Sequence, residues 1–311
     1  MIDVSVVTPS YNRGHLLPRV WASLANQQVG FEWIVVDDGS TDDTNRVIAD
    51  LNDPRIVYIA LPKNSGVNAA RNAGVSAARG RYVVFLDSDD ELYEGSLGRM
   101  VEVMDGADPG VGVAAFACTV ADTGRQICQL PDGHVLNEYD LVCGGALYGG
   151  DKIFMYRREV FDQFRLPADL KGCEHVFLNE VSKAWKYLMV NQPLSIVHRQ
   201  SDNLSNADSL IARSLDIARS YERVLQNHAD ILEHEPSVVT RYLKKALFRY
   251  GVAGSRRDVW RIYLRLMHQS ISLQDRIEGT VLLALSMLGL ASFERWRINC
   301  INRRLIGRDS K

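Results

Sequence analysis

The sequence is poor in features that would place it in a class at once. Its five cysteines are odd in number and follow no paired spacing: Cys118, Cys128, Cys143, Cys173 and Cys300. A disulfide framework or a zinc ribbon is therefore not expected, whereas a reducing compartment is. No basic flank and no apolar core of a signal peptide follow Met1. We therefore expect a cytoplasmic protein.

Long apolar runs are also lacking. The longest, Gly279–Phe293, has only 15 residues, whereas a membrane-spanning helix needs about 20. It is more typical of a core or interfacial helix. The remaining composition is ordinary for 311 residues, with 46% hydrophobic and 24% charged residues and no internal repeat. This excludes a disordered, collagen-like or coiled-coil chain and predicts one or two globular domains.

The two ends of the chain differ in charge. Residues 1–240 hold 21 basic and 33 acidic residues, a balance of −12, and residues 241–311 hold 15 and 5, a balance of +10. A basic region beside Trp260 and Leu264 suits peripheral contact of residues 240–311 with the anionic inner face of the cell membrane. The alternative is a helical bundle whose charges are solvated. No nucleic-acid reader motif accompanies the charge, so no nucleic acid is expected.

Strand and helix patterns alternate over the first ninety residues. Apolar runs predict strands at Val4–Thr8, Trp33–Val36, Ile56–Ala60 and Tyr82–Leu86. Helical spacing follows each of the first three, the last of these helices over Asn68–Ala78. This order predicts an α/β fold with a mostly parallel sheet flanked by helices on both faces.

The pattern loosens after residue 95. Further strands are predicted at Val111–Val120, Arg125–Gln129, Ile153–Tyr156 and Leu194–Val197, with a helix at Val176–Trp185. From Leu204 onward the pattern is almost wholly helical. We therefore expect an α/β domain over 1–205 and a smaller, basic helical region over 206–311.

Acidic residues gather where the predicted strands end. The second strand runs into Asp37-Asp38 and the fourth into Asp87-Ser88-Asp89-Asp90. Ligands of open α/β sheets bind beyond the carboxyl ends of the strands, so these carboxylates are expected at one edge. Repulsion between them calls for a cation, and hard oxygen ligands suit Mg²⁺ or Mn²⁺. The alternative for each acidic run is a solvated turn or a helix cap.

Four blocks together are more specific than any one of them. They are Val6-Val7-Thr8-Pro9-Ser10-Tyr11-Asn12-Arg13, Val35-Val36-Asp37-Asp38-Gly39-Ser40-Thr41-Asp42, Asn64-Ser65-Gly66-Val67-Asn68-Ala69-Ala70-Arg71-Asn72 and Phe85-Leu86-Asp87-Ser88-Asp89-Asp90. In residue types, order and spacing they resemble the family 2 glycosyltransferases over about the first 95 residues. The resemblance implies a GT-A type, Rossmann-like fold and a nucleotide-diphosphate-sugar donor.

Carried over block by block, the resemblance also implies roles for the site residues. Pro9 and Tyr11 would flank the nucleobase, with Asn12 beside them, and Asp38 would accept from the base NH with Asp37 close by. A carboxylate can pair with an imide NH, which favours a UDP-sugar.

The remaining blocks concern the ribose, the phosphates and the metal. Asn64 and Arg71 would support the ribose and diphosphate, and Asp87 with Ser88 would face the ribose or the metal. Asp89 would hold the divalent cation, Mn²⁺ or Mg²⁺.

An inverting transfer needs a base for the acceptor hydroxyl. The family supplies it from a Glu-Asp pair at the start of a helix, and here Gly172-Cys173-Glu174-His175 holds the corresponding place. Since His175 replaces the second acid, Glu174 is the first candidate and His175 the second. A family histidine that joins the metal would fall at Gln200, so His198 is the alternative ligand.

The expected activity is transfer of a hexosyl or N-acetylhexosaminyl group to a glycan or lipid-linked acceptor, with the enzyme in the cytoplasm or at the inner membrane face. Two other functions stay open. A sugar nucleotidyltransferase would need a glycine-rich phosphate loop and a lysine after the first strand, and Pro9–Arg13 has neither. A non-catalytic nucleotide-sugar-binding module would be consistent with the loss of the second acid at His175.

Overall fold

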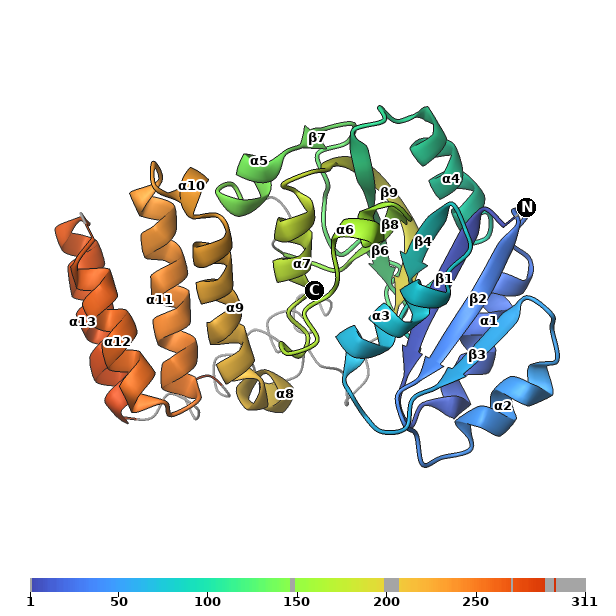
Figure 1. The fold of residues 1–311 in the computed structure, drawn as a ribbon, viewed down its shortest axis with the longest axis horizontal. Helices are drawn as coiled ribbons and strands as arrows, with labels where there is room; N and C mark the ends of the chain where they lie inside the picture. Colours follow the sequence, from blue (N-terminus) through green and yellow to red (C-terminus); the bar gives the residue numbers. More distant parts are fainter. Residues whose placement is uncertain (1, 146–148, 199–206, 270, 289–293, 295–311) are drawn as a thin grey trace. The chain divides into compact units, whose positions relative to one another are not determined.

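A computed structural model describes residues 2–145, 149–198, 207–269, 271–288 and 294 (Figure 1). By its internal contacts the chain divides into two units. The first comprises Met1–Asp169 and Phe177–Arg199, and the second comprises Leu170–Val176 and Gln200–Lys311. The predicted boundary at residue 205 lies outside the described residues. The short segment Leu170–Val176 belongs to the second unit, although it precedes the last strand of the first.

A nine-stranded mixed sheet forms the centre of the first unit, in the order β3-β2-β1-β4-β8-β6-β9-β5, with β7 paired to β9. The strands are β1 (Val4–Ser10), β2 (Phe31–Asp37), β3 (Ile56–Ala60), β4 (Tyr82–Phe85), β5 (Glu91–Leu92), β6 (Val111–Val120), β7 (Val135–Leu136), β8 (Lys152–Arg157) and β9 (Lys186–Val197). The first four are mutually parallel, as predicted, whereas β8 runs antiparallel to both of its neighbours.

Helices cover both faces of this sheet (Figure 1). They are the 3-10 turn η1 (Gly14–Leu16), α1 (Leu17–Ala25), α2 (Thr44–Leu51), α3 (Val67–Ala77), α4 (Ser96–Gly106), α5 (Glu138–Val142), α6 (Val160–Gln163) and α7 (Glu174–Val181). One apolar core contains α1 and α4 residues packed with the β2 side chain Trp33, and a second contains Ala70 of α3 and Phe177 of α7 packed with Ile34. The two cores follow from β2, whose successive side chains point to opposite faces.

The predicted strand at Arg125–Gln129 is wrong. Only an isolated bridge between Thr119 and Gln126 forms there. The side chain of Gln126 donates to the carbonyl of Cys128 at 2.7 Å and to Oδ1 of Asn191 at 2.7 Å. Two backbone hydrogen bonds, from Val120 to the carbonyl of Arg125 and from Ile127 to that of Cys118, flank the bridge. Pairing with β6 therefore covers a single residue pair, and the segment forms no strand.

The last strand is longer than predicted, and the helix before it is shorter. The helix α7 ends at Val181, and β9 already begins at Lys186 instead of Leu194. The polar run Asn191-Gln192-Pro193 hides the first half of β9 in the sequence. The sheet accommodates this run through a shift in register against β6, where Phe116 pairs with Val190 and Ala117 with Pro193.

The second unit is helical, as predicted. Its described helices after residue 206 are α8 (Ala207–Ala212), α9 (Ser214–Asn227), α10 (Ala229–Leu232), α11 (Pro236–Val252), α12 (Arg256–Met267) and α13 (Leu273–Leu288). The core of this unit includes Tyr242, Leu243 and Leu247 of α11. Among the described residues, none of the helices has the length and apolar content needed to cross a bilayer.

Close approach at Gly74 fixes how α3 lies on the sheet. A Cβ atom at this position would lie 2.3 Å from Cγ1 of Val7 in β1 and 3.1 Å from Cγ2 of Val36 in β2. Only glycine therefore lets α3 approach β1 and β2 this closely. Helix α3 also carries Arg71, so this packing positions a predicted site residue.

We expect Gly74→Ala to destabilise the protein by about 1–3 kcal/mol, because the added methyl overpacks the sheet face. Urea unfolding measures the change. Gly98→Ala in α4 is the matched control, since its Cβ would lie 3.7 Å from Cγ1 of Val29, an ordinary contact. There the better helix propensity of alanine should stabilise the protein by up to about 1 kcal/mol. Equal effects at both positions would contradict this account.

Candidate functional site

The carboxyl ends of three parallel strands bring the predicted donor-site residues to one edge of the sheet. Ser10, the last residue of β1, pairs with Asp37, the last residue of β2. On its other side β1 pairs with β4, where Val7 lies opposite Phe85. The segments that follow these strands carry Tyr11 and the acidic residues, so the edge predicted from the sequence exists.

Each of the two predicted metal-binding carboxylates is paired with an arginine. Asp89 is 5% exposed, and its Oδ2 lies 2.9 Å from Nη1 of Arg13. Asp87 is exposed, and its Oδ1 lies 2.7 Å from Nη2 of Arg71. Arg71 is itself buried in α3. The two arginines come from the first and third sequence blocks, and their charges partly balance the acidic segment.

Burial and mutual repulsion also change the proton affinity of this segment. Burial raises the pKa of Asp89, while the charge of Arg13 opposes that rise and the charge of Asp87 adds to it. Burial, followed by the charges of Asp87 and Asp89, raises the pKa of Asp90 to about 8. Asp90 is therefore mostly protonated at neutral pH, which lowers the negative charge of the acidic run.

The carboxylates at the end of β2 hold neighbouring segments in place. Asp38 accepts from the backbone N–H groups of Ser65 and Gly66, each at 2.7 Å. Asp37 accepts from the backbone N–H of Ser40 at 2.8 Å and from the hydroxyl of Tyr58 at 2.5 Å. Both carboxylates therefore fix the segments that lie at this edge of the sheet.

The first and second blocks are tied together by Asn12. Its side-chain oxygen accepts from the backbone N–H of Thr41 at 2.8 Å, and its own N–H donates to Oγ of Ser40 at 2.8 Å. Asn12 adopts a φ of 53°, a left-handed conformation that asparagine tolerates. The side chain of Tyr11 beside it is 44% exposed, so a ring face is open for base stacking.

The second and third blocks meet at Gly39. A Cβ atom on Gly39, whose φ is 76°, would lie 2.6 Å from the carbonyl carbon of Lys63 and 2.8 Å from the nitrogen of Asn64. The turn after β2 therefore lies against the segment before α3. Asn64 itself is exposed, Pro9 is partly buried in β1 and Ser88 is buried within the acidic run.

His198 contacts the end of the acidic run and the residue that follows it. Its backbone N–H donates to Oδ1 of Asp90 at 3.0 Å, and its Nε2 lies 2.6 Å from Oε1 of Glu91. These contacts place it beside the residues that follow Asp89. The alternative ligand, Gln200, lies outside the described residues.

A divalent cation fits this acidic edge in part. Asp87 and Asp89 offer hard carboxylate oxygens, and a nearby cation would relieve their repulsion. Among the described residues no three His, Cys, Asp or Glu side chains form a group that could hold a metal. Mg²⁺ and Mn²⁺ often take one or two carboxylates and complete their coordination with substrate phosphates. The carboxylate pair therefore suits a cation that shares a diphosphate.

The two candidate bases begin α7 and belong to the second unit. Nη1 of Arg213 in that unit donates to the carbonyls of Lys171 and Gly172, each at 3.1 Å. The ring of His175 lies 5.7 Å from that of Tyr221. Burial lowers the pKa of His175 to about 4, the charge of Glu174 opposes that shift, and the charge of Lys245 adds to it. His175 is therefore neutral at pH 7 and a weak proton acceptor.

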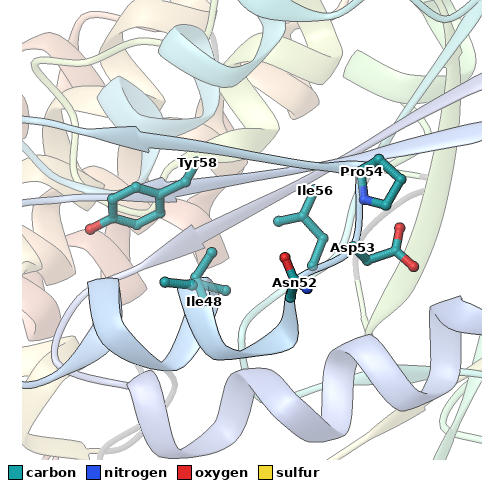
Figure 2. Close-up of a pocket in the computed structure, with 7 residues that line it drawn as sticks. Ile48, Asn52, Asp53, Pro54, Ile56 and Tyr58 are labelled. Atoms are coloured by element: carbon teal, nitrogen blue, oxygen red, sulfur yellow. The ribbon is translucent and has the colours of Figure 1, made fainter.

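A separate hollow of about 370 Å³ lies between α2 and β3 (Figure 2). Ile48, Asn52, Ile56 and Tyr58 are among the residues that line it. None of the predicted site residues does. Tyr58, which lines the hollow, also donates its hydroxyl hydrogen bond to Asp37 at the end of β2.

The predicted site lacked two residues that the structure adds. Arg13 pairs with Asp89, and Tyr58 holds Asp37. Arg13 ends the first sequence block, so a search for charges that balance the acidic edge could have found it. Tyr58 lies inside a strand pattern, where an aromatic residue is unremarkable, and the sequence carried no signal for it.

A parallel βαβ half whose turns carry the acidic residues, followed by a mixed half, is typical of a GT-A type fold. Residues 5–165 match the profile of Glycosyl transferase family 2. The chain belongs to this family, which confirms the predicted resemblance and fold class.

Curated relatives act in bacterial glycan synthesis. Succinoglycan biosynthesis protein ExoO of Rhizobium meliloti is 34% identical over 167 residues, which is 52% of this chain and 48% of that protein. The GalNAc(5)-diNAcBac-PP-undecaprenol beta-1,3-glucosyltransferase of Campylobacter jejuni is 26% identical over 305 residues, 93% of this chain and 94% of that protein. The chain thus spans about half of the first relative and nearly all of the second.

Solved structures agree with the fold. The crystal structure of S. aureus TarS 1-349 superposes with a TM-score of 0.63 at 19% identity, over 91% of this chain and 89% of that one. The same TarS fragment in complex with UDP-GlcNAc superposes with a TM-score of 0.59 at 18% identity, over 93% and 81% of the two chains. At these identities the likeness shows the fold.

The lowered pKa of His175 predicts acid sensitivity. The unfolded chain binds a proton at this residue near pH 6.5, whereas the folded chain does so only near pH 4. Stability from this group is therefore complete above about pH 6.5 and falls as the pH drops toward 4. We expect His175→Gln to flatten the fall in melting temperature between pH 6.5 and 5. The matched control is His134→Gln at an exposed position, which should follow the wild type. Parallel curves for wild type and His175→Gln would disprove the assignment.

Proposed function

We propose that the protein is an inverting glycosyltransferase that moves a sugar from a nucleoside diphosphate to a hydroxyl of a glycan or lipid-linked acceptor. The observation that carries the proposal is the acidic edge, where Asp87 and Asp89 pair with Arg71 and Arg13. Two arginines and two carboxylates there suit a cation and a diphosphate together. Membership of the family and the glycan-synthesis names of its relatives support the same reaction.

The donor we propose is a UDP-sugar. Tyr11 would stack on the base, and Asp38, held by Ser65 and Gly66, retains lone pairs that can accept from the uracil imide. The fork of Arg71 can turn from Asp87 to phosphate oxygens. TarS, which shares the fold, has been crystallised with UDP-GlcNAc.

A divalent ion held by Asp87 and Asp89 would supply Lewis-acid stabilisation of the departing diphosphate. His198 is proposed to support that site through Glu91 and Asp90. Arg13, which lies beside Asp89, would help to offset the charge that builds on the phosphates.

In the transfer step, the acceptor hydroxyl oxygen attacks the anomeric carbon as its proton passes to a carboxylate. The bond between that carbon and the diphosphate oxygen breaks, and its electron pair leaves with the nucleotide. We propose Glu174 as the proton acceptor. His175, with a pKa of about 4, would take the proton far less readily.

The first experiment tests the donor and the metal. UDP with Mn²⁺ should raise the melting temperature more than GDP or CDP does, because the proposed site is specific for uracil. At 100 times its dissociation constant, a ligand adds about 2.7 kcal/mol to the free energy of unfolding. Asp89→Asn should lower turnover by about 10²-fold or more, because charge stabilisation is lost. Asp122→Asn, the same change in an exposed turn, is the control.

Three results would count against this assignment. If turnover in EDTA equals turnover in Mn²⁺, the proposal that a metal takes part is wrong. If GDP raises the melting temperature more than UDP does, the nucleobase of the donor is not uracil. Consumption of added pyrophosphate, with formation of UTP and a sugar 1-phosphate from the UDP-sugar instead of UDP, would favour a nucleotidyltransferase.

The second experiment tests the base. Glu174→Gln keeps the shape and removes the basicity, so we expect unchanged UDP binding and transfer about 10²–10⁴-fold slower. Glu180→Gln, six residues further along α7, is the matched control. If Glu174→Gln is active and His175→Gln is not, His175 is the base. If wild-type protein binds UDP-sugars yet never releases UDP, the chain is a binding module.

The third experiment concerns the membrane. Leu273, Ile277, Val281 and Leu285 are exposed at intervals of four residues on α13, so they share one helix face. We propose that this face and the basic residues of 240–311 contact anionic lipid at the inner membrane face.

Flotation with liposomes containing phosphatidylglycerol should recover the protein, and high salt should weaken recovery because each basic residue contributes about 1 kcal/mol. Ile277→Asp with Val281→Asp should abolish recovery, whereas Gln274→Asp in the first turn of α13 with Ser272→Asp just before the helix should change it less. Equal recovery on neutral and anionic liposomes would contradict the proposed attraction between the basic residues and anionic lipid.

A further inference from the structure

A pocket of about 280 Å³ lies between α11 and α13 in the helical unit. Ser237, Thr240, Arg241, Lys244 and Lys245 line it from α11, and Asp275 lines it from α13. Its lining therefore contains three cationic side chains, one carboxylate and two hydroxyls. This composition is suited to an anion with several oxygen atoms.

The single carboxylate of the lining is already engaged. Nζ of Lys244 donates to Asp275 at 2.6 Å and to Glu278 at 2.5 Å, and hydrogen bonds from Lys244 lower the pKa values of both acids. Lys244 is therefore neutralised locally. Arg241 and Lys245 are the other two cations of the lining.

These two cations are held close together on an aromatic surface. Nζ of Lys245 lies 5.5 Å from the ring centre of Tyr221 and 5.9 Å from that of Tyr242. Cζ of Arg241 lies 5.8 Å from the ring of Tyr242. Burial, and then the positive charge of Arg241, lowers the pKa of Lys245. An anion beside both side chains would relieve this repulsion.

Thr240 is a second, independent sign of a ligand. The residue is 3% exposed, and among the described residues its hydroxyl has no hydrogen-bond partner. A buried hydroxyl without a partner is unfavourable, and a ligand oxygen in the pocket would satisfy it.

The pocket also lies close to the candidate base within the same unit. Lys245 is near enough to His175 for its charge to lower the pKa of that histidine, and Tyr221 contacts both residues. A group bound by Lys245 would therefore lie near the segment that begins α7.

From this arrangement we propose that the pocket binds the phosphate or diphosphate group that links the acceptor glycan to its lipid carrier. This identification of the ligand rests on the proposed glycosyltransferase function. The pocket would hold the charged head group, and the sugar end of the acceptor would extend toward Glu174. The Campylobacter jejuni relative that spans nearly the same length is named for an acceptor linked to PP-undecaprenol.

The test measures diphosphate binding to the full-length protein in EDTA by calorimetry. Inorganic pyrophosphate and geranyl diphosphate should both bind, and Arg241→Gln with Lys245→Gln should weaken both at least tenfold. The control Arg256→Gln with Arg257→Gln, at exposed positions of α12, should bind as the wild type does. Arg71→Gln, at the proposed donor site, is measured alongside: loss of binding in Arg71→Gln, with binding kept in Arg241→Gln with Lys245→Gln, would place the diphosphate at the donor site and overturn the proposal.

Thr240→Val separates a ligand contact from a structural role. It removes the hydroxyl at nearly constant volume, so the melting temperature without ligand should stay the same or rise while pyrophosphate binds several-fold more weakly. Unchanged affinities in both Thr240→Val and the double variant would overturn the proposal. If the double variant misfolds, an unchanged affinity in Thr240→Val alone would overturn it. If pyrophosphate binds and geranyl diphosphate does not, the ligand is not the diphosphate of a lipid-linked acceptor.

Stabilisation by UDP and Mn²⁺ is measured on the same proteins. The double variant should keep it, together with slow hydrolysis of the donor, while its KM for a lipid-linked acceptor rises about tenfold. If UDP binds and the diphosphates do not, only the pocket proposal fails. If UDP fails to stabilise the wild type, the glycosyltransferase proposal fails, and diphosphate binding lost in the double variant would still show the pocket to be an anion site.

Discussion

Repulsion among carboxylates at one edge of the sheet is the constraint on which the rest of the first unit depends. Parallel strands bring Asp37, Asp38, Asp87 and Asp89 to the same edge. The fold balances them with buried or half-buried donors: Arg13, Arg71, Tyr58 and the backbone of Ser65 and Gly66. The arrangement that keeps this edge stable without a ligand also supplies the groups that a metal and a diphosphate would use.

Tight backbone contacts keep these partners in position. Gly74 lets α3 approach the sheet and so carries Arg71 to Asp87. Gly39 lets the turn after β2 touch the segment at Asn64. Asn12 ties the first turn to Thr41. The pairing of Arg71 with Asp87 thus depends on how closely α3 packs on the sheet.

The sequence predicted best where a single physical rule dominates. Continuous apolar runs mark the parallel strands, so β3 was predicted to the residue and β1, β2 and β4 to within two residues at either end. Prediction failed where pairing stops after one residue pair, as at Gln126, and where a register shift accommodates polar residues, as at Asn191. It placed the candidate site residues in motifs, but the pairing of Arg13 with Asp89, 76 residues apart, depends on the folded chain. The roles of these residues stay predictions.

The membership of Leu170–Val176 in the helical unit has a consequence for evolution and for engineering. A chimera that exchanges everything after residue 200 for the equivalent part of a relative would leave Gly172–His175 behind, separated from Arg213, Tyr221 and Lys245. The unit that should be exchanged as a whole is discontinuous in sequence, because it includes the seven residues Leu170–Val176 as well as the C-terminal helices. Acceptor preference in such proteins would then be inherited as two pieces of sequence that must change together.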